Sequence, residues 1–110
     1  MTLDDLIAYG AKVDEGLARC MNNEAFYLRL VGTVKGEAHF GMLFDAMEAG
    51  DLEEAFKAAH ALKGVLGNLS LTPLYEPMSE ITELLRARTD TDYSELLDII
   101  KTKYEEFLAL

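Results

Sequence analysis

The sequence is poor in cysteine, in proline and in basic residues. Its single cysteine, Cys20, cannot close an intrachain disulfide, which excludes a disulfide-stapled fold. The two prolines, Pro73 and Pro77, lie in one short stretch, so the rest of the chain lacks this helix breaker. Twenty acidic residues against ten basic ones give a formal charge of −10, which repels phosphate backbones and anionic lipid headgroups. Nucleic acid and bare membrane are therefore not expected as partners.

Long apolar runs are also absent, and none approaches the ~20 residues that a membrane span requires. The segment 1–5 carries acidic side chains where a secretory signal carries basic ones. We therefore expect a cytoplasmic protein, in a compartment that keeps its cysteine reduced. A chain of 110 residues has the length of one domain with one core, and we predict a single domain over residues 1–110.

Polar and apolar residues do not alternate in the manner of strands, and their spacing predicts an all-α protein. Two short helices are expected at 2–9 and 13–21. A longer helical segment runs from Asn23 to about Ala49, and because each internal glycine weakens a helix by roughly 1 kcal/mol relative to alanine, we expect a kink or break near Gly36.

The pair Gly50-Asp51 predicts the end of one helix and the start of another. Asp51 is a suitable N-cap, and Glu54 three residues later is placed to complete a capping box. The helix that begins here should run to about Leu69. This helix contains the histidine, lysines and glycines on which the functional interpretation depends.

Two further helices are expected in the last third of the chain. Thr72-Pro73 predicts the start of the first, and Pro77 should bend it because proline lacks a backbone donor. The inward stripe of this helix is predicted as Leu74, Met78, Ile81 and Leu85. The second should place these residues at helical spacing: Tyr93, Leu96, Leu97, Ile100, Tyr104, Phe107 and Leu108. Short turns favour antiparallel neighbours, so we predict an antiparallel up-down four-helix bundle with short N-terminal helices.

One histidine in the segment 51–71 stands apart from the predicted core face. At ~100° per residue, seven apolar side chains fall within an arc of roughly 140°: Leu52, Ala55, Phe56, Ala59, Leu62, Leu66 and Leu69. His60 lies outside this arc, about 120° from its middle. Gly64 and Gly67 share its strip of the helix, and Lys57 and Lys63 flank it. We therefore expect His60 to be exposed.

This arrangement suits a histidine that acts as a nucleophile without a helper base. The two glycines together cost the helix roughly 2 kcal/mol, and they remove side chains where a second protein could approach His60. A neutral imidazole, available because its free pKa is ~6.5, is a nucleophile, and its phosphoramidate can pass a phosphoryl group onward. The alternative is an ordinary exposed histidine beside glycines that serve helix packing. Spacing alone leaves both interpretations open.

The run Ala59-His60-Ala61-Leu62-Lys63-Gly64-Val65-Leu66-Gly67-Asn68-Leu69 resembles the signature of histidine phosphotransfer (Hpt) domains. Similarity extends to other positions along most of the chain: Asp14, Gly16-Leu17-Ala18-Arg19, Tyr27-Leu28 and Ala49-Gly50-Asp51. The resemblance implies a four-helix bundle with a phosphorylatable histidine in the middle of an exposed helical face.

The resemblance also implies roles for individual residues. His60 would take the phosphoryl group on Nε2, Lys63 would position or neutralise it, and Gly64 would leave room for the partner, with Gly67 and Lys57 as further binding residues. Such a domain is a phosphohistidine carrier without an ATP site or cofactor of its own. Its partners are response-regulator receiver domains, which supply an aspartate and Mg²⁺, and a hybrid histidine kinase is a further candidate. We expect it to act as a monomer.

The chain departs from the family pattern at three positions. Ser70 replaces a glycine that is usual after the Leu69 position, and Val65 replaces a small or polar residue. An ungapped count places Thr82 where many members have a glutamine that hydrogen-bonds the other nitrogen of the histidine.

Two other functions are alternatives to phosphoryl transfer. The first is a helical bundle that binds receiver domains without transferring phosphate. The second is a di-iron enzyme, whose site would need Glu-x-x-His pairs on two helices. Neither histidine has one, since Lys57 precedes His60 and Gly36 precedes His39 by three residues, and no metal site is expected.

Overall fold

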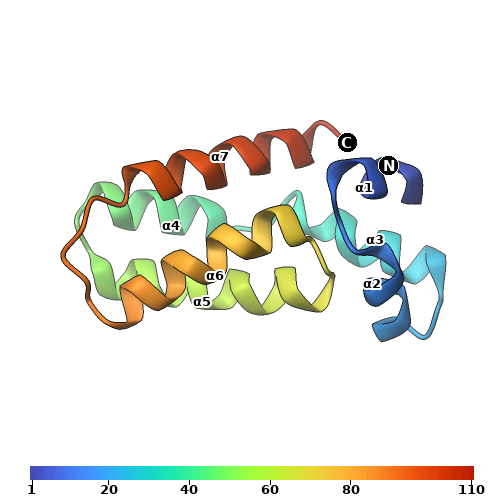
Figure 1. Cartoon of the computed structure of the whole chain (residues 1–110), viewed down its shortest axis with the longest axis horizontal. Coiled ribbons are helices and arrows are strands. Elements are labelled where there is room, and N and C mark those ends of the chain that lie inside the picture. The colour runs from blue at the N-terminus through green and yellow to red at the C-terminus, as the bar shows by residue number, and fades with distance from the viewer.

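Seven α-helices account for the secondary structure of the computed structural model, which describes all residues 1–110 and contains no strand (Figure 1). They are α1 (Leu3–Tyr9), α2 (Val13–Arg19), α3 (Glu24–Val34), α4 (His39–Glu48), α5 (Leu52–Asn68), α6 (Thr72–Arg86) and α7 (Ser94–Leu108). The all-α prediction is confirmed. None of the helices combines the length and the apolar character that crossing a membrane requires.

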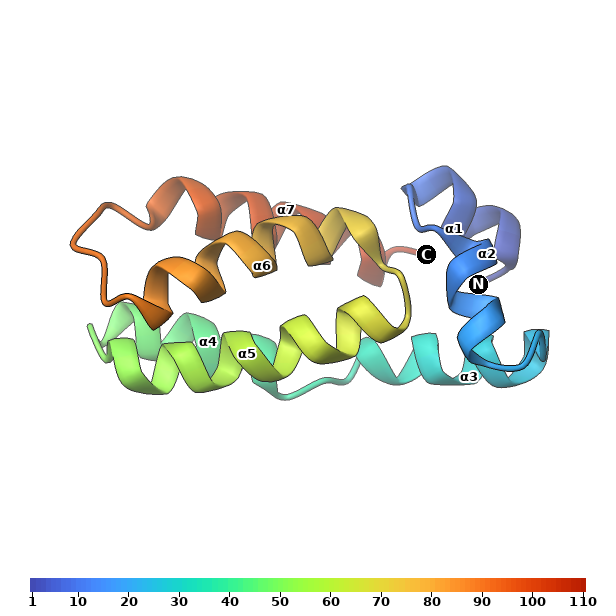
Figure 2. The same ribbon diagram turned by 60° about the horizontal axis from the view of Figure 1, so that its bottom comes forward.

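The bundle is formed by α4, α5, α6 and α7, with α5 packed against both α4 and α6 (Figures 1 and 2). Successive helices run in opposite directions, as the short turns predicted. The helix α3 extends along the line of α4 beyond the end of the bundle, and α1 and α2 pack beside it there (Figure 2). The antiparallel four-helix bundle with short N-terminal helices is confirmed.

The predicted break near Gly36 separates α3 from α4. It spans residues 35–38, and His39 begins the new helix with its Nδ1 at 2.5 Å from Oε1 of Glu37. The side-chain hydrogen bond to His39 is the main cause that holds the pKa of Glu37 below its ordinary value. His39 therefore serves the local structure of this junction.

One hydrophobic core runs through the molecule and takes residues from all seven helices. The predicted inward stripe of α6 is confirmed, because these four side chains are fully buried: Leu74, Met78, Ile81 and Leu85. Cys20 is buried as a small hydrophobe. On α7 the residues at helical spacing differ in burial: Ile100 and Phe107 are fully buried, whereas Leu108, at the end of the helix, is 42% exposed.

The start of α5 follows the prediction only in part. Asp51 caps the helix, with Oδ1 accepting a hydrogen bond from the Glu54 backbone N–H at 3.1 Å. The carboxylate of Glu54 does not complete the capping box and instead accepts a hydrogen bond from Nζ of Lys57 at 3.2 Å. A complete box occurs at α1, between Thr2 and Asp5.

Candidate functional site

The helix α5 presents His60 on the face that points away from the core. Ala59 and Leu62 on either side of it are buried, whereas His60 itself is exposed, as the periodicity predicted. The imidazole is therefore open to a second molecule.

An open cleft of about 600 Å³ lies beside His60, between α5, α6 and the N-terminal helix α2. Its lining residues are mostly polar: Lys12, Glu15, Arg19, His60, Lys63, Gly64, Gly67, Asn68, Ser70, Thr72, Tyr75 and Glu76. The structure thus brings together four of the five predicted site residues. The fifth, Lys57, does not line the cleft and pairs with Glu54 on the surface of α5.

The ring of His60 stacks on that of Phe56, one turn earlier in α5. The ring centroids are 5.5 Å apart, and the planes are inclined by 17°. Residues four apart on a helix are neighbours on one face, which explains the contact. The guanidinium of Arg86, from α6, lies 5.0 Å from the centre of the Phe56 ring. Phe56 therefore contacts both the His60 ring and the Arg86 guanidinium.

Glu83 of α6 binds two cations next to this stack. Its Oε1 accepts a hydrogen bond from Nζ of Lys63 at 3.1 Å, and its Oε2 accepts one from Nε of Arg86 at 3.0 Å. These bonds, the one to Arg86 first and the one to Lys63 second, hold the pKa of Glu83 below its ordinary value. Lys63 therefore lies at the cleft with its charge partly compensated.

The two glycines that share the strip with His60 have different surroundings. A Cβ atom at Gly64 would meet nothing within 4 Å. A Cβ atom at Gly67 would lie 3.1 Å from Cε2 of Tyr75, which packs over this turn of α5. Gly64 thus leaves an open surface beside His60, whereas Gly67 allows α6 to approach α5.

Thr82 does not occupy the place of an orienting residue. It is fully buried, and its Oγ1 donates a hydrogen bond to the backbone oxygen of Met78 at 2.6 Å. The stack on Phe56 is instead the contact that the structure gives to the His60 ring.

The third wall of the cleft is α2, which is bonded to the turn between α5 and α6. Nη1 of Arg19 donates to Oγ of Ser70 at 2.6 Å and to the backbone oxygen of Gly67 at 3.1 Å. Ser70 has φ +55°, in the left-handed region that favours glycine, which explains why a glycine suits this position. The Ser70 hydroxyl, which a glycine would lack, accepts the hydrogen bond from Arg19.

Several residues at the site were not identified from the sequence: Phe56 as a stacking partner, Arg86, Glu83, Lys12 and the cleft-facing role of Arg19. The i, i+4 spacing of Phe56 and His60 was an available signal. The contacts made by Arg86 and Glu83 depend on the register between α5 and α6, for which the sequence offers no local signal.

Comparison with known proteins identifies the family of this chain. The family model of the Hpt domain matches residues 28–110, from the first part of α3 to the end of α7, and includes His60, Lys63 and Gly64. Searches of curated proteins and of solved structures found no match. The helices α1 and α2 lie outside the matched segment. Because the match covers most of the chain, the protein belongs to the Hpt domain family, whose members act in phosphorelay histidine phosphotransfer.

Proposed function

We propose that this chain carries a phosphoryl group on Nε2 of His60 and exchanges it with the aspartate of response-regulator receiver domains. The observation that carries the proposal is the exposed His60 imidazole beside an open helical surface at Gly64. A partner's active site must approach within bonding distance of the nitrogen, and this face of α5 permits such an approach. Membership of the Hpt family supplies the reaction class.

The transfer is a displacement at phosphorus. The lone pair of Nε2 attacks the phosphorus of the aspartyl phosphate, the N–P bond forms, and the P–O bond to the aspartate breaks. The aspartate leaves as a carboxylate, and the attacking nitrogen needs no base because the neutral ring carries its lone pair there. The reverse displacement passes the phosphoryl group onward.

The neighbouring residues have supporting roles in this proposal. Lys63 offers its ammonium to the phosphoryl oxygens, after exchange from Glu83, while Gly64 leaves space for the partner. Gly67 allows Tyr75 to pack, and Lys57 adds positive charge at the edge of the face. The Mg²⁺ of the receiver domain would supply further charge neutralisation, and the chain would contribute no cofactor. We propose that residues 1–110 act as one cytoplasmic, monomeric domain.

Incubation with a phosphorylated receiver domain and Mg²⁺ tests this function directly. The chain is expected to acquire phosphate that is labile in acid and stable in base, as an N-linked phosphoryl group is. Appearance of label should be matched by its loss from the receiver. A stable complex without transferred phosphate would instead identify the chain as a non-catalytic receiver-binding bundle, and the proposal would be withdrawn. A hybrid histidine kinase, tested in the same way, would define the upstream donor.

A further inference from the structure

Two cations on the α2 wall of the cleft have no carboxylate partner. The five ion pairs of the structure are His39–Glu37, Lys57–Glu54, Lys63–Glu83, Arg86–Glu83 and Lys103–Glu106. Lys12 and Arg19, which both line the cleft and are both exposed, belong to none of them. Arg19 donates only to neutral oxygens, those of Gly67, Asn68 and Ser70. Glu15 also lines this wall but pairs with neither cation, so the wall carries two cations against one carboxylate.

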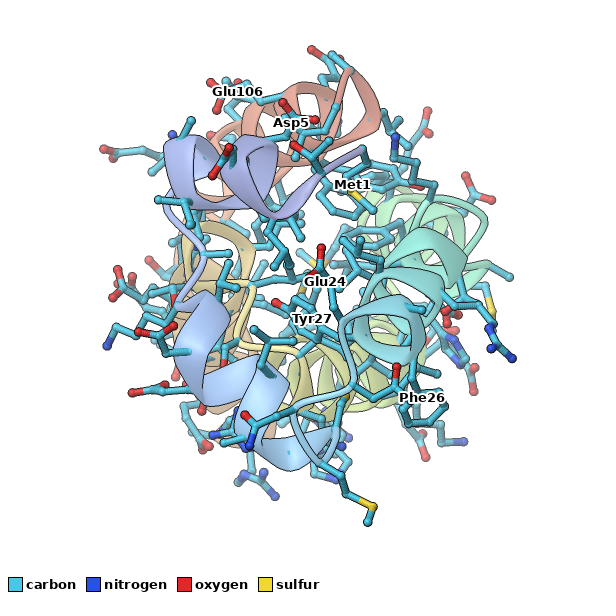
Figure 3. The ribbon with its side chains drawn as sticks, turned by 90° about the vertical axis from the view of Figure 1, so that its right-hand side faces the viewer. Met1, Asp5, Glu24, Phe26, Tyr27 and Glu106 are labelled. Carbon is cyan, nitrogen blue, oxygen red and sulfur yellow. The ribbon has the colours of Figure 1, made fainter.

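This wall is held rigidly against the bundle. Besides the bonds of Arg19, the backbone N–H of Lys12 donates to the backbone oxygen of Ser70 at 3.0 Å. The Tyr27 hydroxyl, from α3, donates to the backbone oxygen of Leu69 at 2.8 Å. The ring of Tyr27 points inward (Figure 3), and only a glycine fits beside it, because a Cβ at Gly16 would clash with Cε1 of that ring. Because the backbone of this wall is preformed, binding there requires less ordering than binding to a flexible segment.

The position of Arg19 excludes direct contact with the transferred group. It is anchored at Gly67, seven residues after His60, and the α-helical rise of 1.5 Å per residue places this anchor roughly 10 Å from His60 along α5. A phosphoryl group on the imidazole would not reach that far. The wall is therefore placed to meet the body of the partner that closes over His60.

The charge of the cleft contrasts with that of the chain. The whole sequence has twice as many acidic as basic residues, whereas the α2 wall of the cleft is lined by Lys12 and Arg19 against Glu15 alone. Exposed charge of one sign steers an oppositely charged partner and selects against others. A partner with carboxylates at the corresponding position would complement this wall.

We infer that α2 is a docking wall on which Lys12 and Arg19 recognise carboxylates of the receiver domain about 10 Å from the site of phosphoryl transfer. The inference rests on the proposed function and adds a determinant of partner choice. The wall lies N-terminal to residues 28–110, the segment that the Hpt family model matches.

Charge reversal at Lys12 tests the docking wall in the full-length chain. Lys12→Glu is compared with Lys101→Glu, which makes the same change on α7, away from the cleft. The measured quantity is kcat/KM for transfer from a phosphorylated receiver domain that serves the wild type. At low salt, Lys12→Glu should lower it roughly 3- to 10-fold relative to Lys101→Glu, and Lys12→Arg should retain it.

Ionic strength gives the second readout. The ratio of the kcat/KM values of Lys101→Glu and Lys12→Glu should approach one in about 1 M salt, where the Debye length is only ~3 Å. Equal kcat/KM for Lys12→Glu and Lys101→Glu at low salt, or a deficit that salt leaves unchanged, would overturn the docking inference while leaving the proposed function intact. A wild-type chain that accepts no phosphate would overturn the proposed function and with it this inference.

A separate observation concerns the orientation of His60. Thr82, at the position of the family's orienting glutamine, is buried and donates a hydrogen bond to Met78. The His60 ring instead stacks on Phe56, whose ring also contacts the Arg86 guanidinium. The Nε2 lone pair lies in the plane of the imidazole, so a contact that restricts this plane restricts the direction of attack. We propose that Phe56 is a positioning residue that orients His60 by stacking.

Phe56→Leu removes the ring and keeps an apolar side chain, and Phe44→Leu is its matched control. Phe44 is also half-buried and has a cation, Nζ of Lys101, 5.2 Å from its ring centre, but it lies on α4. Phe56→Leu should slow transfer roughly 2- to 10-fold, in line with the strength of an aromatic pair, and shift the His60 ring-proton resonances. Phe56→Tyr should restore both. If Phe56→Leu transfers as fast as Phe44→Leu, or Phe56→Tyr fails to rescue, the stack does not position His60.

Discussion

Substitution of His60 by glutamine is expected to abolish phosphoryl acceptance. Glutamine keeps a polar side chain on the same exposed face of α5, so the fold should be retained. It has no nucleophilic nitrogen, because the lone pair of an amide nitrogen is delocalised into the carbonyl. The cleft offers hydroxyls, carboxylates and ammonium groups in place of the imidazole, and none of them forms a phosphoramidate of comparable transfer potential. No stable label should appear on this variant.

Lys63→Ala should reduce the rate of phosphoryl acceptance without abolishing it. Lys63 would stabilise charge without forming a bond, and a charge-assisted contact of roughly 1–3 kcal/mol corresponds to about a 5- to 150-fold change in rate. In the free protein its ammonium is already bound by Glu83, so part of the gain on binding phosphate is offset by the lost ion pair. We therefore expect an effect near the lower end of that range.

The chemical stability of the label identifies the carrier. Wild-type phosphoprotein should lose its phosphate in acid and keep it in base, whereas an acyl phosphate is labile in base. Measurement of both stabilities on wild type and on His60→Gln separates the two attachments. Base-labile phosphate that persists in His60→Gln would place the phosphoryl group on a carboxylate, and His60 would not be the carrier.

The sequence allowed the bundle and the exposure of His60 to be predicted because both depend on local spacing. The apolar arc of α5 identifies its buried face, and His60, which lies outside that arc, is exposed as predicted. The start of α5 and the break near Gly36 followed from glycine and capping preferences in the same way.

The parts of the site that escaped prediction depend on how helices meet. Gly64 and Gly67 are equivalent in the sequence pattern, and only the packing of Tyr75 distinguishes an open surface from a helix contact. Likewise, an ungapped count led to Thr82, but the rotation of α6 turns that residue into the core and turns Glu83 towards Lys63. Rotation and register of α6 are set by the whole interface, so no short motif reveals them.

Gly64→Gln, on the open surface beside His60, is the second substitution with a large expected effect. It should lower the rate of phosphotransfer and raise thermal stability. Gly64→Gln should slow phosphotransfer about 100-fold or more, because the new side chain would extend over the face on which the partner closes, and a misplacement of about 1 Å at a reacting centre can cost about 10²-fold. The same change should raise thermal stability, since Gly64 is exposed within α5 and glutamine is a better helix former by several tenths of a kcal/mol. Gly67→Ala is the matched control: its Cβ would lie 3.1 Å from the Tyr75 ring, so the helical gain should be offset by strain in packing. Transfer rates and thermal unfolding of the three proteins test the pair of effects together. Native transfer by a stabilised Gly64→Gln would show that the partner does not need the bare surface, and a destabilised variant would show that Gly64 serves packing.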